Sequence, residues 1–474
     1  MTRRSSRPVL CAGGAAFPPL LLLFAGCAVE DLACEPADAD TGGWGSEGGD
    51  GSESGDGSDS GEGSESGGGS GGSSDSGVDS GGPSGDCETP ARPFPQHVSY
   101  PGAVISLPGA ADELDDAVVA YYERWAEAYL EEVDPGFDGS RRFRVRMEDD
   151  READTVSEAQ GYGMVIVATM AGADPDARER FDGLWGYRLD HPSEIEPRMM
   201  DWLVPADGSP DPGDDDSAFD GDADMALGLL LADAQWGSGC GVDYRAAAEE
   251  LLAGLLERVV GPDSRLPLLG DWVPEGEYDE WDLRTSDVVP ASFTAFAAVD
   301  PAWEDVRTES LGACAAIAEQ LAGSTGLLPD FAQDGGDGRW SSGPDYLEGE
   351  TDGAWSYNAV RVPWRLGFAA LAQDDAEART LALAMSRWME EKVGGDPTHI
   401  RAGYALDGDK LSGTNYFDPL FGATFGPAAM GDPGGQDWLD AIWAAVATEH
   451  SDYYSDSVTL QAMLVMTENA WLPE

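Results

Sequence analysis

Helical hydrophobic periodicity recurs along most of the chain after residue 111 and limits the possible folds more than any other feature. In the first such stretch, Leu114, Val118, Tyr121 and Trp125 fall on one stripe at helical spacing. Similar patterns predict helices at 112–133, 156–171, 174–185, 222–236, 243–260, 304–322, 353–372, 377–393, 436–448 and 453–470. Residues 142–148 alternate as a short strand would, but the alternation of a parallel sheet is absent. The pattern therefore predicts one large all-α domain.

The first 27 residues resemble an export signal. Three arginines in the first seven residues give a basic start, and an apolar run follows from Ala15 to Ala25. This run is short for a membrane span, and two prolines interrupt it. It ends in Phe-Ala-Gly-Cys at 24–27, which resembles a bacterial lipobox with Phe where Leu is usual. We therefore expect a lipoprotein signal peptide with lipid attached to Cys27; the alternative is an ordinary signal peptide with a chance cysteine.

Residues 28–87 form a segment rich in glycine, serine and aspartate that we expect to be a disordered linker. Between 36 and 86 almost nothing is apolar, so this part cannot bury enough surface to offset its chain entropy. Repeated like charge in a Gly/Ser chain also favours an extended tether. The composition becomes globular after Cys87, so the folded, catalytic part is predicted at 88–474.

The chain is strongly acidic, with 90 Asp and Glu residues against 27 Lys and Arg. Residues 88–474 alone hold 75 acidic and 24 basic side chains, so the excess is not confined to the linker. This charge argues against nucleic acid and anionic membrane surfaces as partners. It indicates either a solvated surface that keeps the protein soluble or attraction of a cationic substrate such as chitosan.

Cysteine and histidine give no sign of a metal site. Cys34 with Cys87, and Cys240 with Cys314, could form disulfides, but the sequence decides neither pairing. The four histidines are scattered, and no Cys-x-x-Cys spacing suggests zinc. The Asp-rich start at 220–224 lacks the twelfth-position Glu of a calcium loop. We therefore expect no metal and no other cofactor.

Two apolar helices in the stretch 155–236 begin with a carboxylate. Glu158 lies in SEAQGYGM and Asp220 in DGDADMA, and Trp185 and Trp202 lie between them. Glycosidases cleave with carboxylic acids and hold sugars against aromatic faces, so this combination points to carbohydrate chemistry. Each residue also has a simpler explanation. The helix dipole favours an acidic residue in a first turn, Asp220 could be an N-cap, and tryptophans most often fill cores.

Paired glycines make the first of these helices unusual. Gly161 and Gly163 each cost roughly 1 kcal/mol relative to Ala inside a helix. Their presence predicts that something approaches the helix backbone closely, and Tyr162 between them could face a sugar. Thr155 or Ser157 is the expected N-cap of this helix.

The same segments carry a specific family resemblance. SEAQGYGM at 157–164, FDGLW at 181–185, DGDADMALGLLLADAQW at 220–236 and WSYNAVRVPWRLG at 355–367 are similar to motifs of glycoside hydrolase family 8, in the same order. The resemblance covers most of 88–474. It implies an (α/α)6 barrel, a toroid of inner and outer helices with a cleft across the helix ends. It also implies inverting hydrolysis of β-1,4-linked glucans, mixed-linkage glucans, xylans or chitosan.

The resemblance also implies roles for single residues. Glu158 would be the general acid that protonates the glycosidic oxygen, which requires a raised pKa in a desolvated site. Asp220 matches the carboxylate that binds and distorts the sugar at the cleavage point. Tyr357 and Arg361 match residues beside the base. The expected substrate-binding residues are Trp185, Trp202, Tyr357, Arg361 and Tyr454.

One position departs from the family pattern. Where many members place an Asp as general base, this chain has Asn358, and an amide cannot accept the proton from water. Subgroups of the family, which include chitosanases and lichenases, carry Asn there and take the base from an insertion just upstream. That segment is acidic here and offers Asp345, Glu348, Glu350 and Asp352. We expect Glu348 to be the base, with Glu350 next; the alternative is a solvated loop and a different or missing base.

RTSDVVP at 284–290 is similar to the same subgroup. The predicted function is therefore endo-acting, inverting hydrolysis of β-1,4 linkages in cellulose or mixed-linkage β-glucan. Two alternatives stay open, a chitosanase of the same family and an inactive carbohydrate-binding surface protein. We expect a polysaccharide partner, no nucleic acid, membrane contact only through a lipid anchor, and a monomer. The protein should be exported, as a cell-surface lipoprotein or in secreted form.

Overall fold

The computed structural model describes residues 89–148, 153–209, 216–239, 241–275 and 278–473. The predictions for the export signal at 1–27, for Cys27 and for the linker at 28–87 lie outside these residues, as does Cys240. Cys314 is described, and it is a buried free thiol. Within the described ranges, no helix is both long and apolar enough to cross a membrane.

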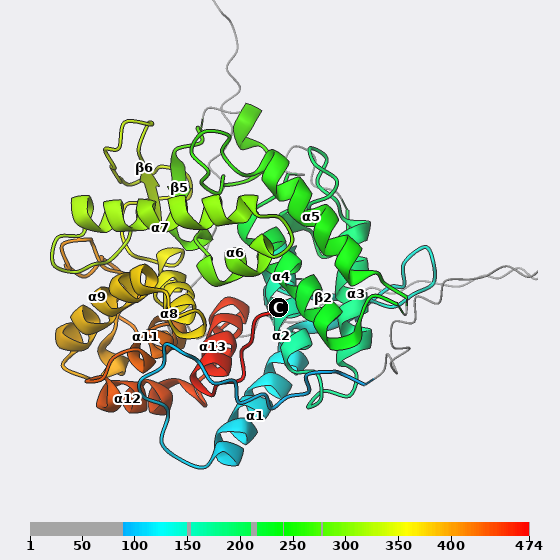
Figure 1. Ribbon diagram of the computed structural model, residues 1–474, viewed down its shortest axis with the longest axis horizontal. Helices are drawn as coiled ribbons and strands as arrows, with labels where there is room; N and C mark the ends of the chain where they lie inside the picture. Colours follow the sequence, from blue (N-terminus) through cyan, green and yellow to red (C-terminus); the bar gives the residue numbers. More distant parts are fainter. Residues whose placement is uncertain (1–88, 149–152, 210–215, 240, 276–277, 474) are drawn as a thin grey trace, which may run out of the picture. The chain divides into compact units, whose positions relative to one another are not determined.

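An inner ring of helices forms the centre of the fold (Figure 1). Its members are α2 (Ser157–Thr169), α4 (Phe219–Trp236), α6 (Pro290–Ala297), α8 (Val362–Ala372), α11 (Gly426–Met430) and α13 (Tyr453–Met466). Each contacts the next in this order, and α13 contacts α2, so the ring is closed. Nearly every residue of α2, α4 and α13 is buried. A helix that is apolar all round needs such an enclosed position.

An outer ring surrounds the inner one (Figure 1). It contains α1 (Ala111–Tyr129), α3 (Ala177–Asp190), α5 (Tyr244–Arg258), α7 (Ala302–Leu321), α9 (Ala376–Val393) and α12 (Gln436–Val446), and the short α10 (Pro419–Ala423) precedes α11. α1, α9 and α12 are amphipathic, and α1 buries the predicted stripe of Val118, Tyr121 and Trp125. Outer and inner helices alternate along the chain, which confirms the predicted (α/α)6 barrel.

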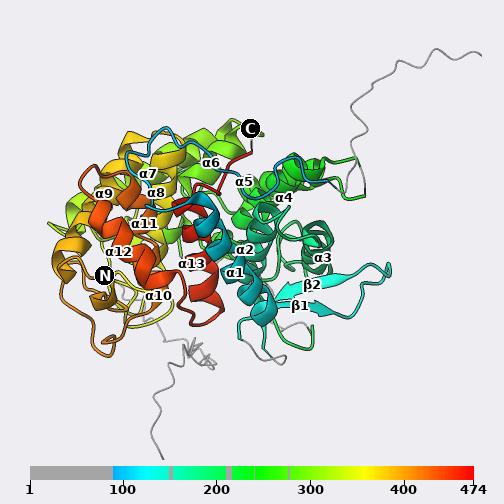
Figure 2. The ribbon, with the colours of Figure 1, turned by 90° about the horizontal axis from the view of Figure 1, so that it is seen from below.

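The described part of the chain also contains three two-stranded antiparallel sheets. β1 (Leu130–Val133) pairs with β2 (Arg142–Val145), β3 (Thr155–Val156) with β4 (Leu203–Val204), and β5 (Asp282–Arg284) with β6 (Phe331–Gln333). Figure 2 shows the β1–β2 hairpin projecting beside α3. The short strand expected at 142–148 is confirmed as β2, but it ends at Val145.

Several predicted helix boundaries are wrong. The helix expected at 112–133 ends at Tyr129, because the chain then turns into strand β1. The helix expected at 353–372 begins only at Val362, after a 3₁₀ turn at Ala359–Arg361. The fully buried Asp330 accepts hydrogen bonds from the backbone N–H groups of Ser356 and Ala359 and so fixes this irregular entry. The short inner helices α6 and α11 have no amphipathic stripe, and the sequence pattern missed both.

Glycine allows α2 and α4 to touch backbone to backbone. A Cβ on Gly161 would lie 2.6 Å from the carbonyl oxygen of Gly221, and a Cβ on Gly221 would lie 2.4 Å from the carbonyl carbon of Ser157. The predicted close approach to the α2 backbone is thus confirmed, and α4 is the element that makes it. Glu158 follows Ser157 and Asp220 precedes Gly221 in the chain. The contact therefore brings these two carboxylates close to each other.

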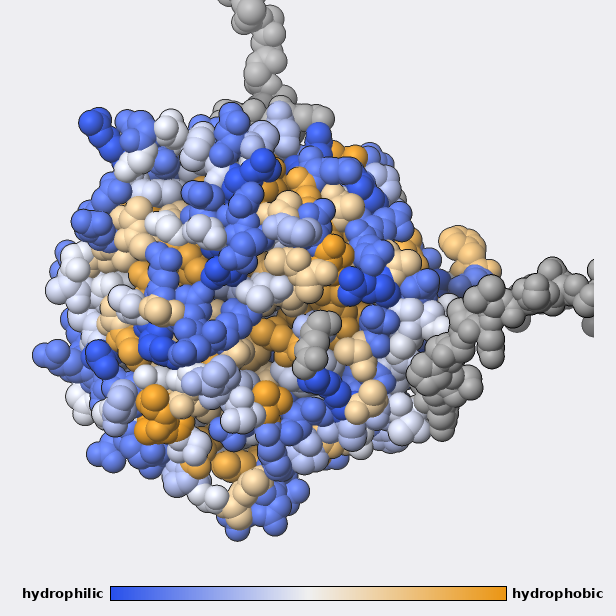
Figure 3. Space-filling view, in the orientation of Figure 1, coloured by the Kyte–Doolittle hydropathy of each residue, from blue (hydrophilic) through white to orange (hydrophobic). Residues whose placement is uncertain are grey.

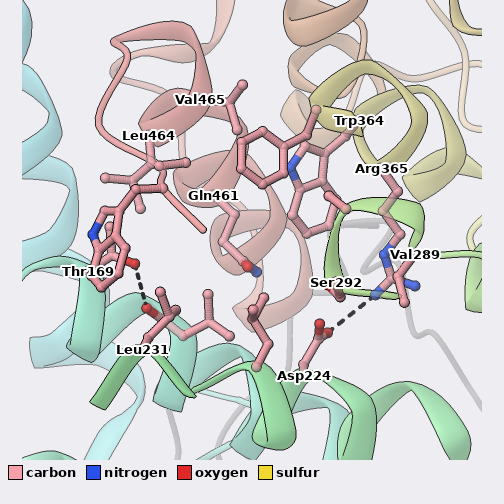
Figure 4. A pocket seen from close by; sticks show the side chains of 16 residues that line it. Thr169, Asp224, Leu231, Val289, Ser292, Trp364, Arg365, Gln461, Leu464 and Val465 are labelled. Carbon is pink, nitrogen blue, oxygen red and sulfur yellow. Dashed lines mark hydrogen bonds and ion pairs between the residues drawn. The ribbon is translucent and has the colours of Figure 1, made fainter. Parts of the chain in front are cut away.

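A small cavity lies between the inner helices (Figure 4). Its volume is about 60 Å³, and its lining includes Leu231, Trp364, Gln461 and Leu464. An ion pair of 3.3 Å joins Asp224 of α4 to Arg365 of α8 at its edge. On this face of the molecule, hydrophilic side chains form most of the outline, and apolar patches lie among them toward the middle (Figure 3).

The contact between α2 and α4 predicts that Gly161→Ala destabilises the protein. The added methyl would force the two helices apart, at a cost of about 1–3 kcal/mol in the free energy of unfolding. The matched control is Gly312→Ala on α7, where nothing lies within 4 Å of the new Cβ, so up to about 1 kcal/mol of stabilisation is expected. Urea unfolding followed by tryptophan fluorescence measures both. Equal stability of the two variants would contradict the close contact.

Candidate active site

Four inner helices begin around one site. Glu158 and Asp220 lie in the first turns of α2 and α4, Arg361 ends the 3₁₀ turn before α8, and Tyr453 is the first residue of α13. The positive ends of these helix dipoles face the same region, which favours negative charge there. The capping predictions were wrong: the N-caps are Val156 and Ala218, neither helix has a side-chain cap, and Asp220 lies inside its helix.

Arg361 joins the two predicted carboxylates. Its Nη1 lies 2.5 Å from Glu158 Oε2 and 2.8 Å from Asp220 Oδ2, and its side chain is 1% exposed. The same nitrogen lies 3.2 Å from the hydroxyl of Tyr162. Because Tyr162 is fully buried and faces the guanidinium, the idea that it faces a sugar is wrong. The carboxylates of α2 and α4 thus share one buried cation.

The second nitrogen of Arg361 extends the network to Asn358, the position at which this chain differs from the family motif. Nη2 donates to Ser286 Oγ at 2.8 Å and to Asn358 Oδ1 at 3.0 Å. Asn358 in turn donates through Nδ2 to Glu348 Oε2 at 2.7 Å. The amide therefore spans the space between Arg361 and a carboxylate from the upstream loop.

The acidic loop contributes one of its four candidates to the site. Glu348 is 28% exposed and lies against Asn358, whereas Asp345 and Glu350 are exposed. Asp352 is buried and accepts backbone N–H groups from residues 347, 348 and 349. These bonds close the loop beneath Glu348. Of the four candidates, Glu348 is therefore the one that contacts the network. Asp352 instead stabilises the loop that carries Glu348.

Arg284 at the end of β5 is a second cation of the network. Its Nη1 lies 3.2 Å from Asp220 Oδ2, and its Nη2 lies 3.8 Å from Glu348 Oε1. Asp287, which is fully buried, lies 4.0 Å from the same Nη1. The sequence showed RTSDVVP only as a similarity, and no role was predicted for these residues or for Ser286. Their closeness to Asp220 is a contact in space, between residues far apart in the chain, so the sequence carried no direct signal of it.

Burial and charge separate the titration of the two helix carboxylates. Burial raises the pKa of Glu158 to about 7, against the attraction of Arg361 and with the help of the nearby Asp220 charge. Burial also acts to raise the pKa of Asp220, but Arg284, Arg361 and Arg365 outweigh it and hold this pKa well below its usual range. Glu158 can thus carry a proton near neutral pH while Asp220 remains ionised.

The aromatic candidates differ in their access to the site. Trp202 is half-buried, and its carbonyl accepts the N–H of Ser157, which places it beside the start of α2. Tyr357 is half-buried, and its hydroxyl bonds that of the exposed Tyr416 at 2.7 Å. Tyr454 is buried with the Arg361 guanidinium 5.7 Å from its ring centroid, and its hydroxyl donates to the carbonyl of Tyr357.

Trp185 does not offer the open surface that a cleft residue needs. It lies within α3, is 6% exposed, and has the guanidinium of Arg188 5.1 Å from its ring centroid. Packing in the protein core explains the burial of Trp185, and its partner Arg188 belongs to the same helix. Tyr416 has the opposite property, since it is 45% exposed next to Tyr357, and the sequence analysis did not select it.

Comparison with known proteins identifies the family. A family model described as "Glycosyl hydrolases family 8" matches residues 109–468. The chain belongs to this family. It is 34% identical over 386 residues to a β-glucanase of Niallia circulans, an alignment that covers 81% of this chain and 92% of the relative. It is 31% identical to an endoglucanase of Bacillus sp. (strain KSM-330), covering 81% of this chain and 82% of the relative. Membership makes the chain a glycosidase that hydrolyses O-glycosyl bonds.

Solved structures agree with this assignment. The apo β-1,3-1,4-glucanase of Paenibacillus sp. X4 superimposes with a TM-score of 0.76 at 34% identity, covering 81% of this chain and 100% of that one. The exo-oligoxylanase Rex8A of Paenibacillus barcinonensis superimposes with a TM-score of 0.63 at 19% identity, covering 82% and 99%. The second likeness shows the shared fold alone.

The raised pKa of Glu158 predicts a basic limit to activity. If Glu158 must give a proton, kcat/KM should fall about tenfold per pH unit above pH 7, because the deprotonated carboxylate has no proton to donate. A pH–rate profile on a soluble β-glucan measures this limb in the free enzyme. A limb that begins near pH 4.5, the ordinary value for Glu, would contradict the desolvated environment of this group.

Proposed function

We propose that the protein is an endo-acting, inverting β-glucanase that hydrolyses β-1,4 linkages in cellulose or mixed-linkage glucan. The observation that carries the proposal is the contact of Glu348 with Asn358, in a network that also contains Glu158 and Asp220. The loop thus supplies a carboxylate next to the position that holds an amide. Because Asp220 is paired with Arg284 and Arg361, Glu348 is the candidate proton acceptor.

The proposed reaction is a single displacement. Glu158 gives its proton to the glycosidic oxygen as the bond to the anomeric carbon breaks. A water attacks that carbon from the opposite face, and Glu348 takes the proton that the water loses. Asp220, ionised between two arginines, accepts hydrogen bonds from hydroxyl groups of the distorted sugar. Each turnover leaves Glu158 ionised and Glu348 protonated, and proton exchange with solvent restores both.

The arrangement of contacts supports inversion. Arg361 and Asn358 intervene between Glu158 and Glu348, so the two carboxyl groups are linked through two side chains. Inverting glycosidases need about 6.5–9.5 Å between these groups to admit a water, whereas retaining enzymes hold them at about 5–5.5 Å. Two side chains between Glu158 and Glu348 fit the larger separation of the inverting enzymes.

The substrate class follows from the relatives. Those named above are described as a β-glucanase, an endoglucanase and a β-1,3-1,4-glucanase, at 31–34% identity. A chitosanase would draw support from the acidic charge of the domain and from Asn358, which fits a subgroup that includes chitosanases, but the relatives do not favour it. An inactive sugar-binding protein is also disfavoured, because Glu158, Asp220 and Glu348 all lie in one network.

Replacing the proposed base should abolish hydrolysis. Glu348→Gln keeps the shape of the side chain but cannot take the proton, so kcat on mixed-linkage glucan should fall by about 10²–10⁴-fold. The matched control is Glu350→Gln, which alters an exposed acid of the same loop and should leave kcat within about twofold. Reducing-sugar release measures both. Equal losses in the two variants, or none in Glu348→Gln, would contradict the assignment.

Product stereochemistry gives an independent check. Hydrolysis by single displacement converts a β-linkage into an α-anomer. Proton NMR recorded within the first minutes of the reaction, before mutarotation, should show the α-anomer first. A β-anomer as the initial product would rule out the proposed mechanism, whichever carboxylate is the base.

We also propose that the protein is exported and anchored through lipid on Cys27. The support is the basic, apolar and Phe-Ala-Gly-Cys pattern at 1–27, followed by a Gly/Ser/Asp-rich segment. Cys27→Ala in a bacterial host should move the protein from the detergent phase to the aqueous phase in a partition experiment. Partition of the unaltered protein into the aqueous phase would contradict the anchor.

A further inference from the structure

A cavity outside the catalytic network opens between the β1–β2 hairpin and the segment that follows α3. Its volume is about 610 Å³, and its lining includes Phe137, Asp190, His191, Glu194 and Asp201. This space is large enough for more than one sugar ring, and the reaction proposed above uses none of these residues. We call it the hairpin cavity. Figure 2 shows the hairpin beside α3.

Both walls of the hairpin cavity are held in place by internal bonds. On the hairpin side, Arg142 of β2 forms a 2.6 Å ion pair with Asp190 at the end of α3. On the other side, residues 191–201 fold back on themselves, because the N–H of Asp201 bonds the carbonyl of His191 and the N–H of Ser193 bonds that of Met199. Ligand sites are usually formed in advance in this way.

One lining residue of the cavity is adjacent in the chain to a residue at the wall of the candidate active site. Asp201 lines the cavity, and the next residue, Trp202, accepts the N–H of Ser157 beside Glu158. Met200, on the other side of Asp201, donates its N–H to Asp222 in the first turn of α4. The segment is therefore fixed to the helices that carry both carboxylates.

The chemistry of the lining fits a neutral sugar chain. The exposed carboxylates of Asp190 and Glu194 can accept hydrogen bonds from sugar hydroxyls, and none of the described lining residues is a lysine or arginine. Phe137 at the hairpin turn is fully exposed and presents an apolar ring of the kind that packs against sugar faces. The tilted pair of Tyr187 and His191, with ring centroids 4.4 Å apart, supports the opposite wall. Anionic polymers would be repelled.

We propose that the hairpin cavity is a distal subsite that binds the glucan chain several sugar units away from the bond being cleaved. The inference rests on the β-glucanase function proposed above and names a further part of its substrate site. A subsite of this kind increases affinity for polymers and leaves the chemical step unchanged. Short oligosaccharides that occupy only the catalytic network do not reach it.

The test compares polymer and oligosaccharide kinetics in the full chain. Phe137→Ala should raise KM for soluble mixed-linkage glucan about two- to tenfold, because one aromatic contact is lost. The value of kcat on the polymer and kcat/KM on a cellotetraose-sized substrate should stay unchanged. The matched control is Val104→Ala, which also removes an exposed apolar side chain. Val104 does not line the hairpin cavity, and its backbone N–H bonds the carbonyl of Met430. An unchanged KM for the polymer, or an equal loss on both substrates, would overturn the subsite.

A binding measurement separates this inference from the proposed function. In gels cast with soluble β-glucan, the unaltered protein and Val104→Ala should be retarded equally, and Phe137→Ala should migrate faster. Faster migration of Phe137→Ala supports the subsite even if no hydrolysis is found, whereas equal migration of all three proteins contradicts it. Absence of hydrolysis by the unaltered protein would contradict only the proposed function.

Discussion

The arrangement of the site depends on the buried guanidinium of Arg361. It contacts Glu158 and Asp220 through one nitrogen and Ser286 and Asn358 through the other. A buried charge is costly unless it is paired and fully hydrogen-bonded, so these partners hold each other in place. The glycine contact between α2 and α4 makes the pairing possible, because it lets the two acidic helix starts lie within reach of a single cation.

The same network explains how neighbouring carboxyl groups can serve different purposes. Asp220 faces two arginines and stays ionised, whereas burial dominates at Glu158 and favours its protonated form. Asp287, buried beside Arg284, has a pKa raised to about 7 by burial, against the pull of Arg284. Pairs of acids whose environments move their pKa values apart are the usual basis of acid–base assignments. The fold supplies these environments through helix starts and buried arginines.

The sequence predicted the helices with strong periodicity and both helix carboxylates, because those signals are local. It also selected Glu348 as the candidate base, and the contacts with Asn358 and Arg284 distinguish that residue from the exposed Glu350. The roles of Arg284 and Asp287 were missed, since their meaning comes from contacts across the barrel. Trp185 was expected along the cleft because tryptophan often packs against sugars. It is buried in α3, however, and exposes little surface.

The most direct test of the central claim, that Glu348 takes over from the missing aspartate, is chemical rescue with azide. In Glu348→Ala the small cavity admits azide, which needs no base and can attack the anomeric carbon while Glu158 still protonates the leaving group. The account predicts that azide restores cleavage of an activated β-glucoside substrate and yields the α-glycosyl azide. Lack of rescue in Glu348→Ala, together with rescue in Glu350→Ala or Asp345→Ala, would contradict it.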